Sequence, residues 1–164
     1  MLESIVRASA RIDAPPARVY GIIADYRNGH PHILPKQFRN LVVEAGGVGA
    51  GTIISFEVRA FGMTRRLRAA ITEPQPGRIL VESNMDPAPS VTTFTVEPAE
   101  GGQASDVTIE TRLGTKPGIL GTIERAMSSG FLRSLYSEEL ALLDARAKVP
   151  GSTFQVPGSR RPEP

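Results

Sequence analysis

Residues 52–72, with the sequence TIISFEVRAFGMTRRLRAAIT, decide the fold of this chain. Before Gly62 the apolar side chains of Ile54, Phe56 and Val58 alternate with polar ones. After Gly62 a second alternating face comprises Met63, Arg65, Leu67, Ala69 and Ile71. Alternation with a period of two and one apolar face is typical of a half-buried strand. The stretch therefore predicts two antiparallel strands joined by a tight turn at Gly62.

Similar segments flank this hairpin on both sides. Their ranges are 4–12 and 41–43 upstream, and 78–85, 91–97 and 106–113 downstream. Turns rich in Gly, Pro and acidic residues separate the later segments, and short turns favour antiparallel pairing. The sequence thus predicts a sheet of seven antiparallel strands.

Helical periodicity appears outside these strands. Residues 16–25 carry an apolar stripe at helical spacing, and the Gly- and Pro-containing segment 27–35 permits one further short helical turn. Residues 119–148 contain no proline and predict a helix of roughly 40 Å. Its apolar stripe comprises Leu120, Ile123, Met127, Phe131 and Leu135. The expected fold class is α+β: a curved seven-stranded antiparallel sheet wrapped around a long C-terminal helix, with two short helices between strands one and two.

Composition limits the classes of protein to which the chain can belong. The 164 residues are 40% hydrophobic and 22% charged, which predicts one compact domain over residues 1–148. Residues 149–164 are rich in Pro and Gly and predict a disordered tail. The absence of cysteine excludes disulfides and thiolate chemistry. A formal net charge of +2 is too weak to indicate a nucleic-acid partner.

The chain also lacks the patterns of targeting segments. An acidic residue, Glu3, stands where a secretory signal needs a base, and no apolar region follows it. No apolar run is long enough for a membrane-spanning helix. We therefore expect no integral membrane segment and a cytoplasmic protein.

The expected architecture leaves room for a ligand. A helix is only about 10–12 Å wide, so a strongly curved sheet around one helix is not filled at its far end. Apolar spaces of this kind bind small molecules, and the alternative is a space filled by the protein's own side chains. The residues expected to line it are Ile54, Phe56, Val58, Met63, Arg65, Leu67, Ile79, Val81, Ser83, Met85, Phe94, Val96, Ile109, Thr111, Leu120, Ile123, Met127 and Phe131.

Arg65 carries the clearest chemical signal, because the alternation places it on the apolar face. An inward arginine either pairs with an acid or offers its guanidinium group to a ligand carboxylate or enolate. Two alternatives remove this role: a one-residue shift of register, or a position near the strand end from which the side chain reaches water.

Tyr26, His30 and His32 are the other candidates for catalysis. An imidazole titrates near neutral pH and can transfer protons together with an acid, whereas the alternative is a set of polar residues on a loop at the cavity mouth. Two histidines fall short of the three protein ligands of a catalytic zinc site, so we expect no metal and no cofactor. The carboxylates Glu138 and Glu139 are expected on the solvated face of the last helix.

A glycine-rich run at residues 46–51 invites comparison with phosphate-binding loops. Such loops open a helix, whose N–H groups meet the phosphate, but this run opens a strand. We interpret it as a flexible hairpin loop.

Four motifs give the chain a resemblance to a known superfamily. They are ASARIDAPPARVY at 8–20, GAGT at 49–52, PQPGRI at 74–79 and LRSLY at 132–136. Over residues 3–148 the chain resembles the SRPBCC superfamily, also called START/Bet v 1-like, and within it the polyketide cyclase/dehydrase branch. Members often carry an aromatic residue, commonly Trp, after the first helix, where this chain has NGHPH at 28–32.

The resemblance implies a helix-grip fold with a hydrophobic cavity, and it does not imply catalysis. In aromatase-type relatives a cavity arginine polarises a carbonyl, which implies such a role for Arg65. We therefore expect the chain to bind a hydrophobic, lipid-like or polyketide-like small molecule for transport or sequestration. The first alternative is a polyketide cyclase or dehydrase of aromatase type that uses Arg65 with a hydroxyl or a histidine. A weaker alternative is a module for a protein partner, and formation of a homodimer stays open.

Overall fold

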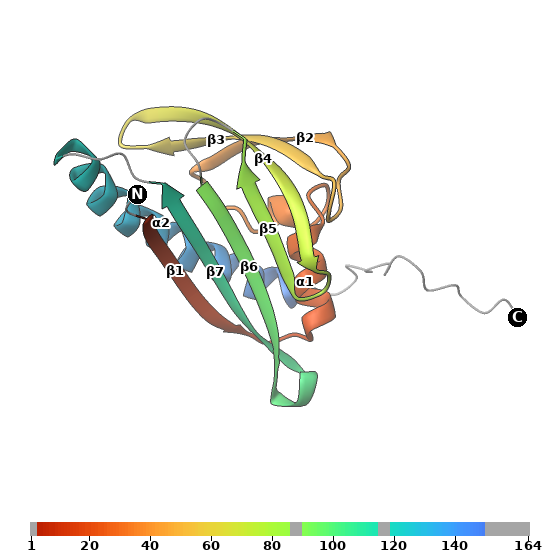
Figure 1. Cartoon of the computed structure of the whole chain (residues 1–164). Coiled ribbons are helices and arrows are strands. Elements are labelled where there is room, and N and C mark those ends of the chain that lie inside the picture. The colour runs from red at the N-terminus through yellow and green to blue at the C-terminus, as the bar shows by residue number, and fades with distance from the viewer. Residues whose placement is uncertain (1–2, 86–89, 115–118, 150–164) are drawn as a thin grey trace, which may run out of the picture.

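The chain folds in the order of elements that the sequence predicts (Figure 1). A computed structural model describes residues 3–85, 90–114 and 119–149, with the backbone alone for residues 3 and 119–128. The strands among these residues are β1 (Glu3–Ile12), β2 (Phe38–Ala45), β3 (Ile53–Ala60), β4 (Met63–Gln75), β5 (Ile79–Asn84), β6 (Ser90–Ala99) and β7 (Ala104–Gly114). The helices are α1 (Pro16–Ala24), the 3-10 turns η1 (His30–His32) and η2 (Glu100–Gly102), and α2 (Ile119–Ala147).

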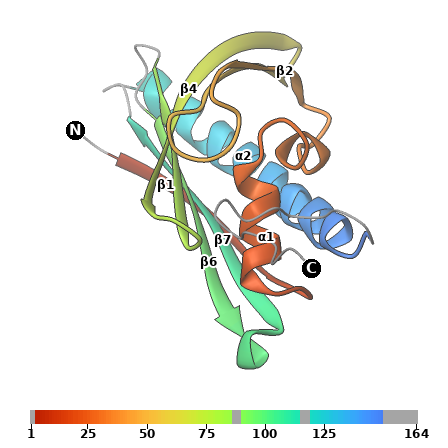
Figure 2. The same ribbon diagram turned by 90° about the vertical axis from the view of Figure 1, so that its right-hand side faces the viewer.

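All seven strands form one antiparallel sheet in the order β1-β7-β6-β5-β4-β3-β2. The sheet bends so that β2 and β4 arch over α2, and both α1 and α2 lie on its concave side (Figure 2). The predicted α+β class, the curved seven-stranded sheet and the long C-terminal helix are therefore confirmed.

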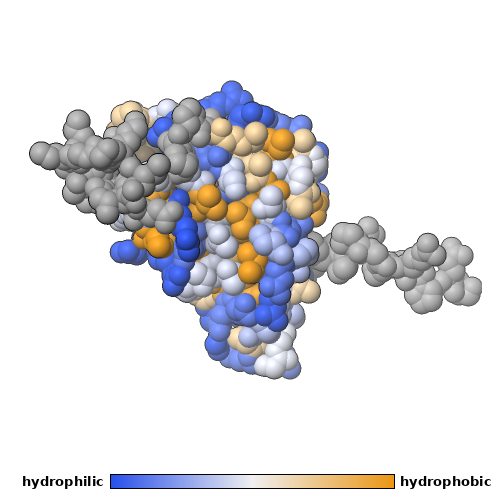
Figure 3. Space-filling model, in the orientation of Figure 1, coloured by the Kyte–Doolittle hydropathy of each residue, from blue (hydrophilic) through white to orange (hydrophobic). Residues whose placement is uncertain are grey.

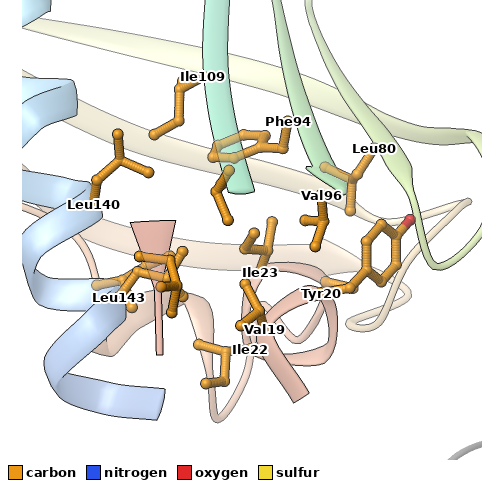
Figure 4. Close-up of a cluster of buried hydrophobic side chains, with 14 of the residues drawn as sticks. Val19, Tyr20, Ile22, Ile23, Leu80, Phe94, Val96, Ile109, Leu140 and Leu143 are labelled. Atoms are coloured by element: carbon orange, nitrogen blue, oxygen red, sulfur yellow. The ribbon is translucent and has the colours of Figure 1, made fainter. Parts of the chain in front are cut away.

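A closed core fills one end of the concave side (Figure 4). There α1 and α2 share one cluster of buried side chains with the middle strands, and the members named below each expose 2% or less of their surface. Burying one such side chain stabilises the fold by about 1.5–3 kcal/mol, so this end holds the sheet and both helices together. The cluster includes Val19, Ile22, Ile23, Leu80, Phe94, Val96, Ile109, Leu140 and Leu143.

The other end of the concave side is covered less completely. Across β3 and β4, Phe56 pairs with Leu67 and Val58 with Arg65, so the four residues share the face of the buried core. Phe56, Val58 and Leu67 are nevertheless only half-buried. At the tip of this hairpin, Phe61 reaches α2, where its ring centroid lies 5.4 Å from that of Phe131.

The convex face of the sheet meets solvent (Figure 3). Hydrophilic side chains predominate there, with a narrow apolar stripe among them. Arg7 and Glu110 form an ion pair across β1 and β7, and Arg11 pairs with Asp106 at 2.8 Å. Exposed pairs of this kind contribute about 0–1 kcal/mol each, so they mark the solvated face rather than stabilise the fold.

Strand β5 presents the face opposite to the predicted one. Leu80 pairs with Phe94 of the core and Glu82 pairs with Thr92, so Leu80 and Glu82 point inward. Residues 79–81 are apolar on both faces and fit either register, and a bulge in β4 beside β5 shifts the pairing. The prediction of an inward orientation is therefore wrong for Ile79, Val81, Ser83 and Met85.

The glycine-rich run at 46–51 is anchored to the end of α1. The Tyr26 N–H donates to the Gly47 carbonyl at 2.9 Å, and the Gly49 N–H donates to the Ala24 carbonyl at 2.9 Å. The Ala50 N–H donates to the Glu73 carboxylate at 2.7 Å. The run is therefore the hairpin loop between β2 and β3, as the sequence predicts, and these hydrogen bonds tie it to α1 and β4.

The remaining expectations concern α2 and the tail. Leu135 is buried, and Phe131 and Leu132 are half-buried, so this stripe of α2 turns inward rather than toward a partner. In the part of the chain that the structure describes, no helix combines the length and apolarity needed to cross a membrane. The predicted tail from residue 150 onward and the side chains of Leu120, Ile123 and Met127 lie outside the described residues.

Candidate functional site

A group of polar side chains interrupts the apolar interior between β5 and α2. Tyr26 follows α1, His30 begins η1, Glu82 lies in the middle of β5, and Glu139 lies on α2. His30 exposes 3% of its surface, Glu139 3% and Tyr26 1%. We call these four residues the buried acid cluster.

Local hydrogen bonds bring Tyr26 and His30 under α1. The Asp25 carboxylate accepts bonds from the Arg27 and Asn28 N–H groups at 3.0 and 2.9 Å, and the Asp25 carbonyl accepts one from His30 at 2.7 Å. Gly29 passes so close to the backbone of Ile22 that a Cβ atom would overlap it. The sequence Asp25–Gly29 thus forms a turn that sends the imidazole back into the interior.

The imidazole of His30 is oriented by its second nitrogen. Its Nδ1 lies 2.7 Å from the Ile23 carbonyl, which can only accept, so Nδ1 carries a hydrogen. Nε2 then faces two carboxyl groups, with Glu82 Oε1 and Glu139 Oε1 each 3.8 Å away. The ring stacks on Tyr26 with the centroids 4.5 Å apart.

Glu82 and Glu139 differ in their surroundings. The Tyr26 hydroxyl donates to Glu82 Oε1 at 2.6 Å, a bond that favours the charged carboxylate. Glu139 lacks such a donor in the described part of the chain, and burial, followed by the charge of Glu82, raises its pKa well above the ordinary value. Burial also raises the pKa of the Tyr26 hydroxyl, with Glu82 adding to the effect. The cluster therefore favours a neutral, proton-bearing Glu139 beside the Glu82 carboxyl group, which accepts the hydrogen bond from Tyr26.

A chain of hydroxyl groups lies beside the cluster on the same face. Thr92 and Thr111 are 2.7 Å apart, and Thr111 is 2.5 Å from the Tyr136 hydroxyl. Burial, as the largest effect, raises the pKa of Tyr136 to about 12, so the hydroxyl stays protonated. These hydroxyl groups form hydrogen bonds with one another, so their role is structural.

Glu82 is the member of the cluster nearest to the less completely covered end of the concave side. Its side chain is 15% exposed, whereas those of Glu139 and His30 are 5% and 3% exposed. Along β5, fully buried Leu80 precedes Glu82 on the same face and half-buried Asn84 follows it. Glu82 therefore stands at the boundary between the closed core and the partly covered apolar residues of the β3–β4 hairpin.

The structure brings together only part of the residues that the sequence singles out. Tyr26 and His30 meet in the cluster, and the alternative of polar residues on a loop at the cavity mouth does not fit His30, which is buried. His32 is exposed. Arg65 lies on the predicted face, opposite Val58, but its side chain is exposed near the end of the hairpin.

Apart from Ile79, Val81 and Ser83 of β5, the other predicted lining residues whose side chains the structure describes fall into two groups. The first faces the interior, where lining of a cavity remains a prediction; its described members are Ile54, Phe56, Val58, Leu67, Phe94, Val96, Ile109, Thr111 and Phe131. The second consists of Met63 and Met85, which expose 74% and 48% of their surfaces.

The sequence analysis missed both carboxylates of the cluster. The prediction that Glu139 is solvated is wrong, because it lies four residues after Leu135 and four before Leu143, on the buried face of α2. That spacing was the available signal. Glu82 was hidden by the wrong register of β5.

No group of three or more His, Asp and Glu side chains within the described residues is placed to hold a metal ion. In the cluster, Nε2 of His30 lies 3.8 Å from an oxygen of Glu82 and 3.8 Å from an oxygen of Glu139, which is beyond hydrogen-bond distance. The arrangement can hold a proton on Glu139, and its polar groups can accept or donate hydrogen bonds to a polar group of a ligand.

Comparison with known families gives a decisive match. A family model described as "Polyketide cyclase / dehydrase and lipid transport" matches residues 4–148. The chain belongs to this family. No curated protein gives a significant sequence match.

Solved structures share the fold of this chain. The KanY protein, determined by NMR, has a TM-score of 0.79 and 26% identity, covering 91% of this chain and 100% of that one. The Zhui aromatase/cyclase from Streptomyces sp. R1128 has a TM-score of 0.75 and 12% identity, covering 90% and 94%. A START superfamily protein from Mycobacterium smegmatis has a TM-score of 0.68 and 13% identity, covering 88% and 97%. The fold is thus the helix-grip fold of the START/Bet v 1-like superfamily.

Proposed function

We propose that the protein binds a hydrophobic small molecule, lipid-like or polyketide-like, between the concave face of the β3–β4 hairpin and α2. The observation that carries this proposal is the half-exposed state of Phe56, Val58 and Leu67 on the face that is fully buried at the other end. The family includes cyclases, dehydrases and lipid-transport proteins, all of which handle apolar molecules.

Apolar burial supplies most of the affinity in such a site. Each Å² of apolar surface removed from water contributes roughly 25 cal/mol, before the costs of association. Glu82 at the inner boundary offers a polar anchor, so we expect a ligand with an apolar body and at least one hydroxyl or carbonyl group.

Titration with the apolar dye Nile red, together with native mass spectrometry of protein purified from its own host, tests the proposal. Leu67→Gln places an amide on the concave face and is expected to weaken dye binding about tenfold. Val42→Gln changes an exposed side chain, 52% accessible, and serves as the control with unchanged binding. Absence of both dye binding and a co-purified ligand contradicts the proposal, and equal effects of the two variants contradict the location.

A second candidate function is that of a polyketide cyclase or dehydrase, and the buried acid cluster favours it. Arg65 shares a face of β4 with Leu67 and is exposed near the end of the hairpin, and in this proposal its guanidinium polarises a carbonyl of a ligand. In that case Arg65→Ala abolishes turnover of a poly-β-ketone while binding of Nile red is retained. Arg66→Ala, on the opposite face, is the control, and an unchanged rate in Arg65→Ala excludes this role for Arg65.

A further inference from the structure

We propose that a surface hollow beside the edge strand β2 binds the phosphate group of a phosphate monoester. The hollow has a volume of about 280 Å³ and is lined by Lys36, Gln37, Arg39 and Arg59. Ligand pockets usually measure about 300–1,000 Å³, so this hollow suits a small anion or headgroup rather than a large molecule. We call it the cationic hollow.

The strand register separates the cationic hollow from the proposed apolar site. Val58 lies on the concave face of β3, and successive side chains of a strand point to opposite faces, so Glu57 and Arg59 lie on the convex face. Arg39 pairs with Glu57 and shares that face. The Arg59 N–H donates to the Gln37 carbonyl at 2.9 Å, which joins two sides of the hollow. The two sites therefore lie on opposite faces of the sheet.

The first support is the unpaired charge of the hollow. Within the described residues Lys36, Arg39 and Arg59 form no ion pair, whereas other arginines of the sheet pair with acids, among them Arg7, Arg11, Arg68, Arg78 and Arg112. Glu57 lies opposite Arg39 in the register, but its carboxylate accepts a hydrogen bond from the Asn40 amide at 2.9 Å and forms no ion pair in this part of the chain. A concave surface lined by one sign of charge attracts ions of the opposite sign.

The second support is an amide oxygen at the same place. Gln37 Oε1 is buried and has no hydrogen-bond partner in the described part of the chain. A buried acceptor without a donor destabilises the protein, because it has lost its hydration and gained nothing in exchange. Since Gln37 lines the hollow, a bound molecule with a hydroxyl group can supply the missing donor.

These groups together indicate the class of ligand. Guanidinium groups bind carboxylate and phosphate oxygens through two parallel hydrogen bonds. A phosphate monoester carries a charge of about −1.5 to −2 at pH 7, which matches three cations better than the single charge of a carboxylate. We therefore expect a phosphate monoester with a neighbouring hydroxyl group, either as a free molecule or as the headgroup of a lipid.

Isothermal titration calorimetry with sn-glycerol 3-phosphate tests the proposal. We expect saturable binding at low ionic strength that weakens as NaCl is added, because salt screens exposed charges. Arg39→Gln combined with Arg59→Gln is expected to lower the affinity about tenfold, since it removes two charged donors. Both side chains are exposed, so the double variant should fold. Arg11→Gln combined with Arg78→Gln removes the same charge from arginines that already pair with acids, and it should bind like the wild type.

The role of Gln37 is tested with a second ligand. Methyl phosphate carries the same charged group without a neighbouring hydroxyl, so the wild type should bind it more weakly than sn-glycerol 3-phosphate. Gln37→Leu removes the acceptor and is expected to abolish this difference, while its affinity for methyl phosphate stays unchanged. A difference that persists in Gln37→Leu overturns the role of the amide oxygen.

Cosedimentation with vesicles distinguishes the two sources of the phosphate group. Vesicles of phosphatidylcholine with phosphatidic acid are compared with vesicles of phosphatidylcholine alone. Binding that requires phosphatidic acid, and that the Arg39→Gln and Arg59→Gln double variant loses, identifies a lipid headgroup, whereas binding of sn-glycerol 3-phosphate alone identifies a free molecule. Absence of both, or equal binding by wild type and double variant, overturns the proposal. Binding of Nile red should be unaffected throughout, so this failure leaves the proposed function standing.

Discussion

Glu139 Oε1 lies 3.8 Å from Nε2 of His30, with both side chains almost excluded from solvent. The groups that face this carboxyl come from separate elements: Glu82 from β5, His30 from η1, and the tyrosines after α1 and on α2. No lysine or arginine forms an ion pair with Glu139 in the described residues, so its charged form is unfavourable in the folded protein.

Glu139→Gln is therefore expected to stabilise the protein at alkaline pH. Since the folded pKa lies above the ordinary 4.5, the contribution of Glu139 is fully present below about pH 4.5 and is lost as the pH rises through the folded value. The variant lacks this loss, so its advantage over the wild type grows as the pH rises from 4 to 8. Urea unfolding at both values measures it. An advantage that shrinks with pH contradicts the burial argument, and Glu138→Gln is the exposed control.

Tyr26→Phe removes the donor to Glu82 while keeping the ring stacked on His30. A buried hydrogen bond to a charged group is worth about 1.5–3 kcal/mol, and we expect a loss of that size in the free energy of unfolding. Tyr20→Phe removes a comparable bond to Glu73, but the Ala50 N–H still holds that carboxylate, so its cost should be smaller. Equal costs would show that Glu82 finds another partner when Tyr26 is changed.

The architecture followed from the sequence because its signals are local and repeated. Alternation in β3 and β4 identifies their inward faces from the sequence alone. The pairing of Phe56 with Leu67 confirms that these two residues share a face. Alternation failed in β5, where Leu80 and Val81 are both apolar and the register depends on a bulge in the neighbouring strand. The predicted inward orientation of Val81 and Ser83 turns Glu82 outward, and the error in register therefore hid this carboxyl group.

The candidate site was harder to predict because its members come from three segments distant in the sequence: residues 26–30, β5 and α2. As a charged residue, Glu139 was expected to be exposed. Its position on the helix, four residues from both Leu135 and Leu143, instead places it on the buried face of α2. The inward path of His30 depends on a turn at Asp25 and Gly29 whose hydrogen bonds only the three-dimensional structure reveals. The alternation predicted the correct face for Arg65, but its side chain is exposed. Burial along a strand declines toward the strand end, and hydrophobic periodicity gives no information about that decline.

Gly49→Ala is expected to destabilise the connection between β2 and β3. Gly49 has φ of +64°, and an added Cβ would overlap the Glu73 carboxylate that holds the Ala50 N–H and the Tyr20 hydroxyl. We expect a loss of about 2–3 kcal/mol from backbone strain and displaced hydrogen bonds together. Gly51 also has a positive φ, +87°, but the space around an added Cβ is open, so Gly51→Ala measures the backbone strain without the overlap. Urea unfolding measures the loss of stability in both variants. A loss in Gly49→Ala no larger than that in Gly51→Ala contradicts the expected overlap with Glu73.

Phe61→Ala is expected to speed the exit of a bound molecule. Phe61 lies at the tip of the β3–β4 hairpin with φ of +52°, and its ring meets Phe131 of α2 at 5.4 Å across the partly covered end of the concave side. An aromatic pair of this kind contributes about 0.5–1.5 kcal/mol, so its loss should raise the dissociation rate of Nile red by roughly 2- to 10-fold, measured by stopped-flow displacement. Met63→Ala alters a more exposed side chain of the same hairpin and should leave the rate nearly unchanged. Because the contact joins the sheet to the helix rather than lining the inner wall, the association rate should rise as well. Equal dissociation rates in Phe61→Ala and wild type would show that ligands leave by another route.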